Sequence, residues 1–261
     1  MIDCPSPPCR LVFSPTGSLP ASTMINAVLL LSPEALEWAY PEPVLAQLRS
    51  QVATLSVFSP AETWRAEPGI LAAADVLFSG WGAPLIDDDF LRQAPRLKAV
   101  FYAGGSVRYF VTPALWQRGI RLSTAQSSNA IPVAEFTVAS LVLGLKRAWH
   151  YARLTRQTRG FPPERPMPGA YRTTIGLVSY GVIARLVRQK LREFEVNVVV
   201  YDTLLTGDEA QAEGVETVRL EELFAWADAV SVHTRHLAKT TGMIRGRHFE
   251  ALRPGAFFLN M

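Results

Sequence analysis

The stretch Thr174–Asp202, TIGLVSYGVIARLVRQKLREFEVNVVVYD, decides the fold of this chain. Ile175–Val178 is a short apolar run, as expected of a strand that is buried on both faces of a parallel sheet. From Val182 the apolar residues recur with helical spacing, and Val196–Tyr201 is apolar throughout its second half. The order of strand, tight turn, amphipathic helix, strand and acidic residue is the layout of a dinucleotide-binding βαβ unit.

The turn and the acidic residue carry the chemistry of this unit. Gly181 lets the backbone approach a pyrophosphate, and the start of the following helix offers N–H groups and a positive dipole end to phosphate. Asp202 ends the second strand, 23 residues after Ser179. A carboxylate there can accept hydrogen bonds from an adenosine ribose and would repel a 2′-phosphate, so it favours NAD over NADP.

The glycine motif is degenerate, and this leaves alternatives open. The chain has Ser179-x-Gly181-x-x-Ala184 in place of Gly-x-Gly-x-x-Gly. Alanine in the third position still allows close packing of helix on strand, whereas serine in the first position departs from the residue that makes the tight turn. An ordinary βα turn that binds nothing, and a methyltransferase with an acidic residue after its second strand, fit the same pattern.

Composition bounds the class of protein. The chain has 261 residues, of which 49% are hydrophobic and 19% charged, so it can bury one large or two small cores. The net charge is +3 and the basic residues are scattered, so we expect no nucleic-acid partner. We find no apolar run near the roughly 20 residues that span a bilayer, so no membrane partner is expected. Residues 1–23 do not read as a signal peptide.

The only cysteines, Cys4 and Cys9, lie in the proline-rich start of the chain. No second pair of cysteines or histidines is near them, so we expect no metal site and a flexible tail over residues 1–23. Met24 directly precedes the first strand-like run, and we expect natural translation to begin there. Because the rest of the chain lacks cysteine, it suits the reducing cytoplasm, where we expect the protein to be.

The segment from about residue 25 to 125 alternates strand-like and helix-like patterns, which predicts a doubly wound parallel sheet. Thr112 followed by Pro113 predicts a helix start, with threonine as the N-cap. The predicted strands are Ala27–Leu31, Thr54–Phe58, Asp75–Ser79, Leu97–Ala103 and Arg121–Thr124, and the predicted helices lie near 43–50, 87–94 and 112–118.

Two features of the sequence are candidates for substrate binding. Gly104, Gly105 and Ser106 follow a predicted strand, where adjacent glycines can present N–H groups to an anion such as a carboxylate; a flexible turn is the alternative. Asn129 precedes a long helix predicted from Val133 to about residue 151, and it either caps this helix or points into a cleft. We place Glu135 in the first turn of that helix, where it complements the dipole.

Several segments, taken in order, resemble the D-isomer-specific 2-hydroxyacid dehydrogenase family. The resemblance covers roughly residues 70–261 and, more loosely, 25–70. It rests on LKAVFYAGGSVR (97–108), RGIRLSTAQSSNAIPVAEFTVASLVLGLKR (118–147), TIGLVSYGVIARLV (174–187), VVVYD (198–202), ADAVSVH (227–233), TTGMI (240–244) and LRPGAFFLN (252–260).

The resemblance implies an α/β protein with two doubly wound parallel-sheet domains. After the tail, residues 24–126 would form the N-terminal part of a flavodoxin-like substrate domain, and 127–261 an incomplete NAD-binding Rossmann domain. It implies an NAD-dependent oxidoreductase acting on the CH–OH group of a small 2-hydroxy acid, or reducing the 2-oxo acid, and a homodimer at full length.

The resemblance also assigns site residues. Substrate-binding positions would be Gly104, Gly105, Ser106 and Asn129. The first motif position, Ser179, and the pyrophosphate turn of Gly181, Val182 and Ile183 would bind the cofactor, together with the ribose acceptor Asp202 and the nucleotide-bordering His233 and Thr240. Four of the chain's residues depart from the family pattern: Ser179 and Val182 in the glycine turn, Arg235 in place of a frequent proline, and Arg108 in place of a frequent aspartate.

The family's catalytic arginine, glutamate and histidine would all follow residue 261, so we expect no catalytic residue within this chain. We therefore expect a truncated protein without turnover, whose Ala256–Leu259 forms an exposed apolar edge. The alternative is a catalytically silent protein that binds a nucleotide or serves in interactions.

Overall fold

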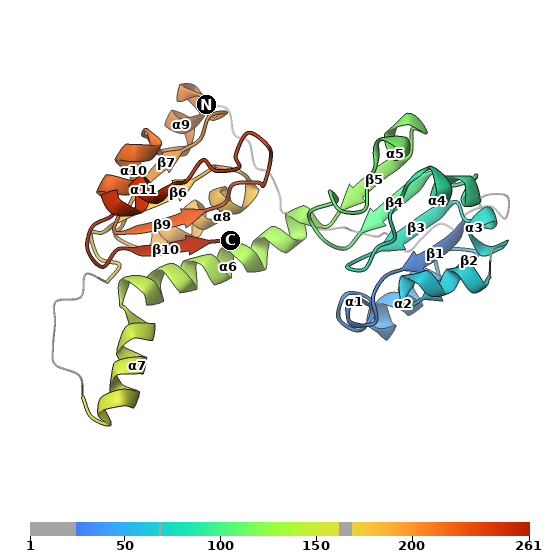
Figure 1. Cartoon of the computed structure of the whole chain (residues 1–261), viewed down its shortest axis with the longest axis horizontal. Helices are drawn as coiled ribbons and strands as arrows, with labels where there is room; N and C mark the ends of the chain where they lie inside the picture. The colour runs from blue at the N-terminus through green and yellow to red at the C-terminus, as the bar shows by residue number, and fades with distance from the viewer. Residues whose placement is uncertain (1–24, 68, 162–168) are drawn as a thin grey trace, which may run out of the picture. The chain divides into compact units, whose positions relative to one another are not determined.

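The computed structural model describes residues 25–67, 69–161 and 169–261, so Cys4, Cys9 and Met24 lie outside the described residues. The chain divides into two compact units, Met1–Thr124 and Ala125–Met261 (Figure 1). Each unit is built on a five-stranded parallel sheet, so the predicted fold class, two doubly wound α/β domains, is confirmed.

The first unit has the strand order β2-β1-β3-β4-β5, which is the flavodoxin-like order. Its strands pair in parallel, with Ala27 of β1 opposite Leu55 of β2 on one side and Val76 of β3 on the other. All five predicted strands are confirmed to within two residues at each end. They are β1 Asn26–Leu30, β2 Thr54–Phe58, β3 Val76–Ser79, β4 Ala99–Tyr102 and β5 Arg121–Thr124.

The helices of the first unit are short, and side chains fix several of their starts. Ser32 accepts a hydrogen bond from Ala35 N at 3.2 Å, and Asp87 accepts one from Phe90 N at 2.9 Å. Thr112 precedes the helix as predicted but does not cap it, because its Oγ1 donates to Ile86 O at 2.6 Å instead. The helices are α1 Pro33–Ala39, α2 Glu42–Arg49, η2 Ala61–Ala66, α3 Gly69–Ala73, α4 Asp88–Gln93 and α5 Pro113–Gln117.

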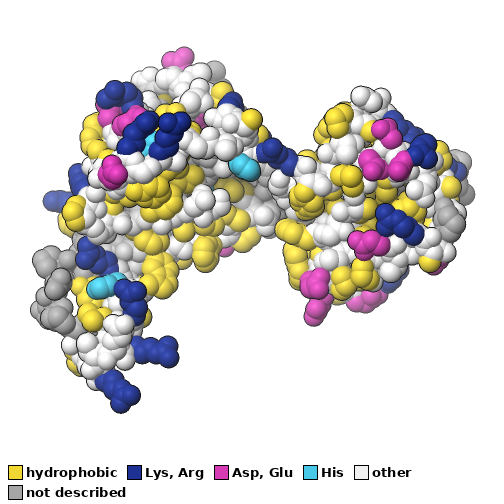
Figure 2. Space-filling model, in the orientation of Figure 1, with side chains coloured by type: hydrophobic (Ala, Val, Ile, Leu, Met, Phe, Trp, Pro, Cys, Tyr) yellow, Lys and Arg dark blue, Asp and Glu magenta, His cyan; other side chains and the backbone are white. Residues whose placement is uncertain are grey.

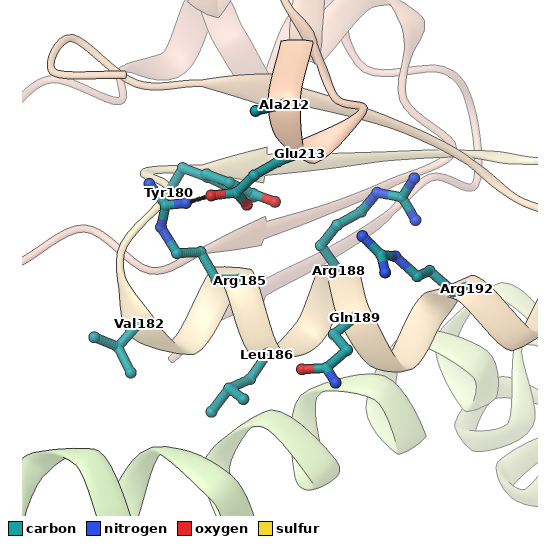
Figure 3. Close-up of a pocket in the computed structure, with 9 residues that line it drawn as sticks. All are labelled: Tyr180, Val182, Arg185, Leu186, Arg188, Gln189, Arg192, Ala212 and Glu213. Carbon is teal, nitrogen blue, oxygen red and sulfur yellow. Dashed lines mark ion pairs between the residues drawn. The ribbon is translucent and has the colours of Figure 1, made fainter. Parts of the chain in front are cut away.

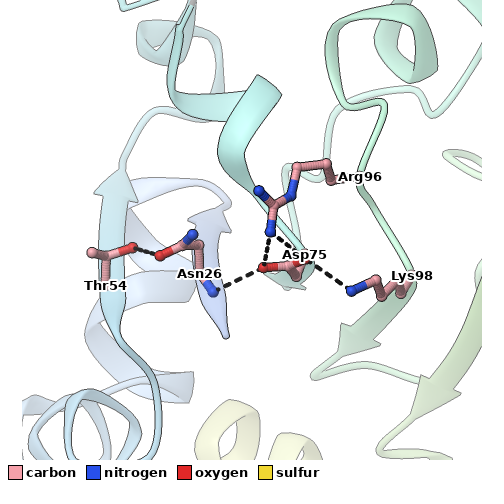
Figure 4. Close-up of polar contacts among 5 residues, drawn as sticks. All are labelled: Asn26, Thr54, Asp75, Arg96 and Lys98. Carbon is pink, nitrogen blue, oxygen red and sulfur yellow. Dashed lines mark hydrogen bonds and ion pairs between the residues drawn. The ribbon is translucent and has the colours of Figure 1, made fainter. Parts of the chain in front are cut away.

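A buried carboxylate joins three strands at the amino end of this sheet (Figure 4). Asp75, which is 4% exposed, directly precedes β3 and accepts a hydrogen bond from Asn26 N of β1 at 3.2 Å. Its oxygens also accept from Arg96 at 3.2 Å and from Lys98 at 3.1 Å, just before β4. Burial opposes ionisation, but these hydrogen bonds and the charge of Arg96 outweigh it, so the pKa of Asp75 is lowered.

The second unit has the strand order β10-β9-β6-β7-β8. Numbered from its own first strand this is 3-2-1-4-5, the order of a dinucleotide-binding Rossmann sheet. β10 forms one edge of the sheet, as predicted, and contains Phe257, Phe258 and Leu259 of the predicted apolar edge but not Ala256. These three residues are half-buried rather than exposed. The strands are β6 Thr174–Val178, β7 Asn197–Tyr201, β8 Glu216–Thr217, β9 Ala229–Val232 and β10 Phe257–Asn260.

The second sheet carries the same carboxylate arrangement as the first. Asp228 directly precedes β9 and accepts a hydrogen bond from Thr174 N, the first residue of β6, at 2.8 Å. Arg253 donates to its other oxygen at 3.0 Å. Both units therefore use one aspartate to fix the amino end of a central strand to its neighbour.

The long helix α6, Gln126–Leu145, begins seven residues earlier than predicted and contains Pro132. The prediction placed the proline near the helix start, but packing of α6 against α8 carries the helix through that position. The helix ends before Arg147, whose φ of 52° is left-handed, and α7 Ala148–Thr158 is separate. Glu135 is therefore not in a first turn; it forms an ion pair with Lys190 of α8 at 3.0 Å.

α6 also corrects the expectation that no apolar segment approaches the length of a membrane span. It is 20 residues long and has a mean hydropathy of 1.4, so it is long and apolar enough to cross a membrane. Of its apolar stretch, 39% is buried within the structure. The core helix of a soluble protein meets the same criteria. α6 packs against α8, β9 and β10, although less than half of the apolar stretch is buried. The remaining helices are α8 Val182–Lys190, η3 Leu191–Glu193, α9 Gly207–Glu213, α10 Leu220–Trp226 and α11 Gly246–Ala251.

Candidate functional site

The turn after β6 keeps the backbone shape of the glycine motif, although Ser179 replaces the first glycine. Ser179 has a φ of 72°, in the left-handed region that glycine adopts without cost. A serine there costs about 1–2 kcal/mol, because its Cβ crowds the backbone. Ser179 therefore makes the same tight turn as the motif glycine, with some strain.

The backbone of the turn is open to a ligand at Gly181. This residue occupies the N-cap position of α8, and a Cβ placed on it would meet no atom within 4 Å. Space for a side chain is therefore available, and the glycine leaves that space to a ligand. Because Gly181 has no side chain to cap the helix, the first N–H groups of α8, from Val182 and Ile183, can point to an anion.

Asp202 lies just after β7, beside this turn. Its Oδ2 accepts hydrogen bonds from Tyr180 N at 2.6 Å and from the Ser179 hydroxyl at 3.3 Å, and its Oδ1 accepts from Leu204 N at 2.6 Å. Partial burial opposes ionisation, but these donors outweigh it, so the pKa of Asp202 is lowered and the side chain is a carboxylate at neutral pH.

The turn, the carboxylate and the end of β9 surround one pocket of about 510 Å³. Six of the seven predicted cofactor residues line it, namely Ser179, Gly181, Val182, Ile183, Asp202 and His233. The seventh, Thr240, lines an adjoining pocket of about 90 Å³ that shares Ser179, Asp202, Leu204 and Arg235 with the first.

His233 is a neutral part of the pocket wall. Its Nε2 lies 3.0 Å from the Ser231 hydroxyl, and its buried Nδ1 has no hydrogen-bond partner among the described residues. Burial lowers the pKa of His233 to about 4. The imidazole therefore has no proton to donate as an acid at neutral pH. Thr240 shapes the next loop, because its Oγ1 donates to Arg235 O at 2.7 Å and accepts from Leu237 N at 2.9 Å.

The structure adds pocket residues that the sequence reading missed. Gln126, Leu204, Leu205, Glu209 and the cations Arg185 and Arg235 also line the larger pocket. A usable signal existed for Arg185, since it lies one turn into the helix that follows the glycine turn. The sequence contained no such signal for Gln126, because α6 was predicted to start after this residue.

The predicted substrate residues lie outside these pockets. In the first unit, Gly104 is buried, and a Cβ there would lie 2.6 Å from the Tyr102 ring, so this close approach requires glycine. The N–H groups of Gly104, Gly105 and Ser106 donate no hydrogen bond to any described residue. In the second unit, Asn129 is exposed within α6, and its N donates to Ala125 O at 2.8 Å. Substrate binding by these four residues stays a prediction.

Within the described ranges, no group of three or more histidine, cysteine, aspartate or glutamate side chains could hold a metal ion. The pocket is lined instead by the glycine turn, by two carboxylates, Asp202 and Glu209, and by two arginines. These are groups that bind phosphates and hydroxyls.

A 3-2-1-4-5 parallel sheet with a phosphate-type turn after its first strand and a carboxylate after its second defines a Rossmann-type dinucleotide-binding domain. Residues 139–261 match the family described as D-isomer specific 2-hydroxyacid dehydrogenase, NAD binding domain. This part of the chain is similar to that family, so the resemblance found in the sequence is confirmed.

Two curated relatives are D-3-phosphoglycerate dehydrogenases. That of Mycobacterium tuberculosis (strain H37Rv) is 29% identical over 178 residues, which are 68% of this chain and 34% of the relative. That of Homo sapiens is 25% identical over 179 residues, which are 68% of this chain and 33% of the relative. This chain thus matches about a third of the length of these relatives.

Solved structures share the fold over both units. A phosphoglycerate oxidoreductase from Rhizobium etli gives a TM-score of 0.69 at 20% identity, covering 90% of this chain and 71% of that one. The D-lactate dehydrogenase from Aquifex aeolicus, complexed with NAD and lactic acid, gives 0.67 at 19% identity, covering 90% and 68%. At these identities the likeness concerns the fold alone.

Proposed function

We propose that this chain binds NAD(H) in the pocket beside Gly181 and serves an oxidoreductase that interconverts a 2-hydroxy acid and a 2-oxo acid. One observation carries the cofactor part: the Asp202 carboxylate and the open N-terminus of α8 line the same pocket. The pyrophosphate would accept hydrogen bonds from N–H groups of Gly181, Val182 and Ile183. Thr240 and its neighbours in the adjoining pocket would border the nucleotide.

The Asp202 carboxylate can still accept a hydrogen bond from a ribose hydroxyl, although protein donors already use part of its acceptor capacity. Its Oδ1 accepts one hydrogen bond from protein, and a carboxylate oxygen can accept two. The low pKa keeps the group charged, so a 2′-phosphate at this position would be repelled. This supports NAD over NADP as the cofactor.

The nicotinamide, when bound, supplies the chemistry by exchanging a hydride with the second carbon of the acid. The protein's contribution is to hold and orient both molecules. For the substrate we propose the loop Gly104–Ser106 as the carboxylate site, because its N–H groups have no other acceptor among the described residues. Asn129 is proposed as a further substrate contact.

We also propose that the 261-residue chain by itself does not turn over. His233 is neutral and held by Ser231, so it cannot act as the proton donor that ketone reduction needs. His150, His236 and His248 line neither of the two adjoining pockets. The test is NADH oxidation in the presence of glyoxylate, pyruvate or hydroxypyruvate. Steady turnover by this chain would contradict the proposal.

The cofactor proposal is tested by titrating the chain calorimetrically with NADH and NADPH. We expect NADH to bind more tightly, and Asp202→Asn to weaken NADH about 10-fold or more, because charge-assisted hydrogen bonds to the ribose are lost. Glu250→Gln removes an exposed carboxylate of the same unit outside the pocket and is the matched control. Equal NADH affinity in both variants would refute the assignment.

A catalytically silent nucleotide-binding protein is the second candidate. The hydrogen bond from Tyr180 N to Asp202 favours it, since it takes up part of the acceptor capacity of that carboxylate. A protein of this kind would bind NADH but reduce no 2-oxo acid.

For the partner, we propose a second copy of the chain. α6 exposes large apolar side chains, with Phe136 61%, Ile131 49% and Leu143 46% exposed. Figure 2 shows hydrophobic side chains over the part of this helix that faces the viewer. Phe136 and Leu143, seven residues apart, lie on one face of the helix. Such a face suits a homodimer contact, and the mass measured by light scattering reports whether the contact forms.

A further inference from the structure

A second pocket of about 460 Å³ lies along α8 and the end of α9 (Figure 3). Three arginines from one side of the α8–η3 segment line it, namely Arg185, Arg188 and Arg192. In Figure 3 the guanidinium groups of Arg188 and Arg192 extend from the helix toward the same side. Glu213 is the pocket's only acidic lining residue, and it forms an ion pair with Arg185.

The charges of the pocket are not balanced by the protein. With Arg185 and Glu213 paired, Arg188 and Arg192 leave two positive charges without an acidic partner among the described residues. Arg188 donates from Nη2 to Gly214 O at 3.3 Å, while its buried Nε has no acceptor within the described ranges. Like charges four residues apart on a helix repel each other, so an anion between them would be favourable.

Tyr180 adds a buried donor to the same pocket. The side chain is 4% exposed, and its hydroxyl has no hydrogen-bond partner among the described residues. Burial raises the pKa of Tyr180 in spite of the three arginines nearby, so the hydroxyl keeps its proton at neutral pH. Two groups in this pocket lack a hydrogen-bond partner among the described residues, the Tyr180 hydroxyl and the Arg188 Nε. Both can donate a hydrogen bond, and the Arg188 Nε cannot accept one.

We propose that this pocket binds a phosphate dianion, either as inorganic phosphate or as a phosphate monoester. Arginine forks match the oxygens of phosphate, and a dianion would balance the two uncompensated charges. The Tyr180 hydroxyl would supply a neutral hydrogen bond to the same group. The proposal goes beyond NAD binding and does not depend on it.

The phosphate group could come from two sources. Tyr180, Val182 and Arg185 line both this pocket and the neighbouring dinucleotide pocket. The ligand is therefore either a separate phosphate compound or a phosphate group of a dinucleotide bound next door.

The test is calorimetric titration of the 261-residue chain with inorganic phosphate at constant ionic strength. We expect saturable binding that Arg192→Gln weakens about 10-fold, since one charge-assisted hydrogen bond is lost. Lys190→Gln removes the same charge from the same α8–η3 segment but from a residue outside the pocket, and should leave the affinity unchanged. No saturable binding, or equal affinities in the two variants, would overturn the proposal.

Two further variants make the result specific. Tyr180→Phe keeps the ring and all charges, so a loss of phosphate affinity in this variant assigns the hydroxyl to the ligand. Arg188→Gln should weaken binding as Arg192→Gln does, with circular dichroism reporting whether the chain is folded. Arg192 is exposed, so its variant tests the pocket even if the half-buried Arg188 proves necessary for folding.

Repeating the titration with saturating NADH or NADPH identifies the source. Phosphate binding that persists under both dinucleotides indicates a separate phosphate compound. Phosphate binding that either dinucleotide abolishes, together with weaker binding of that dinucleotide by Arg192→Gln, indicates a phosphate of the cofactor itself. Competition without any effect of Arg192→Gln on the dinucleotide would place phosphate in the dinucleotide pocket and overturn the proposal.

Discussion

Ser179 shows how one residue can depart from a motif and still keep its backbone shape. Its φ of 72° is the conformation that the motif reserves for glycine. The side chain gives partial compensation, because its hydroxyl donates to Asp202 at 3.3 Å. The sequence identified the departure, but only the backbone angle shows that the turn is preserved.

We predict that Ser179→Gly stabilises the chain by about 0.5–1 kcal/mol, because relief of left-handed strain exceeds the entropy that glycine adds to the unfolded chain. Ser179→Ala keeps the strain and loses the hydroxyl, so it should be less stable than both. Urea unfolding measures all three. A Ser179→Gly variant that is no more stable than Ser179→Ala would show that the turn is not strained.

His233 gives a pH dependence of stability. Its pKa is about 4 in the folded chain and 6.5 ordinarily, so between these values the unfolded chain binds a proton that the folded chain does not. Stability is then complete above pH 6.5 and falls as the pH drops toward 4, by roughly 1–3 kcal/mol. We predict that His233→Gln flattens this part of a plot of unfolding free energy against pH. An unchanged slope in the variant would assign the dependence to other groups.

Among single residues, Asp202 was the most predictable and the pocket arginines the least. A carboxylate after the second strand follows from chain order alone, and the structure places it beside the glycine turn. No role was predicted from the sequence for Arg188 and Arg192. Their meeting with Tyr180 depends on where α9 packs, which no local pattern specifies.

At the scale of elements, most strands were predicted because they are short apolar runs between polar turns. β8, which consists of the two polar residues Glu216 and Thr217, was not predicted. α8 begins at Val182, as the change of period predicted. α1, α3 and α9, which are five to seven residues long and show little periodicity, were not predicted. The equally short α5 was predicted, because Thr112 and Pro113 mark its start. α6 was predicted to begin too late, at Val133 directly after Pro132, whereas it begins at Gln126.

The aspartates that precede β3 and β9 allow a matched pair of variants. We predict that Asp75→Asn and Asp228→Asn each cost about 1–3 kcal/mol in their own unit, because hydrogen bonds to charged donors are lost. Hydrogen exchange of the strand amides in each unit reports the loss. Both should leave NADH affinity unchanged, since neither residue lines the dinucleotide pocket. A large drop in NADH affinity for either would contradict this view.

For the whole molecule, two separate sheets mean that a ligand of one unit need not stabilise the other. At free NADH about 100 times the dissociation constant, binding should add about 2.7 kcal/mol to the stability of the binding unit. We predict slower hydrogen exchange within Ala125–Met261 and little change within residues 25–124. Equal protection of both units would show that they unfold together.

Asp75 and Asp228 occupy the amino ends of their sheets, whereas the glycine turn and Asp202 lie at the carboxyl ends. Substitutions that alter ligand preference can therefore accumulate at the carboxyl ends of the strands, while the aspartate that joins the strands at their amino ends stays in place. A chain organised in this way can acquire a new specificity without first sacrificing its capacity to fold.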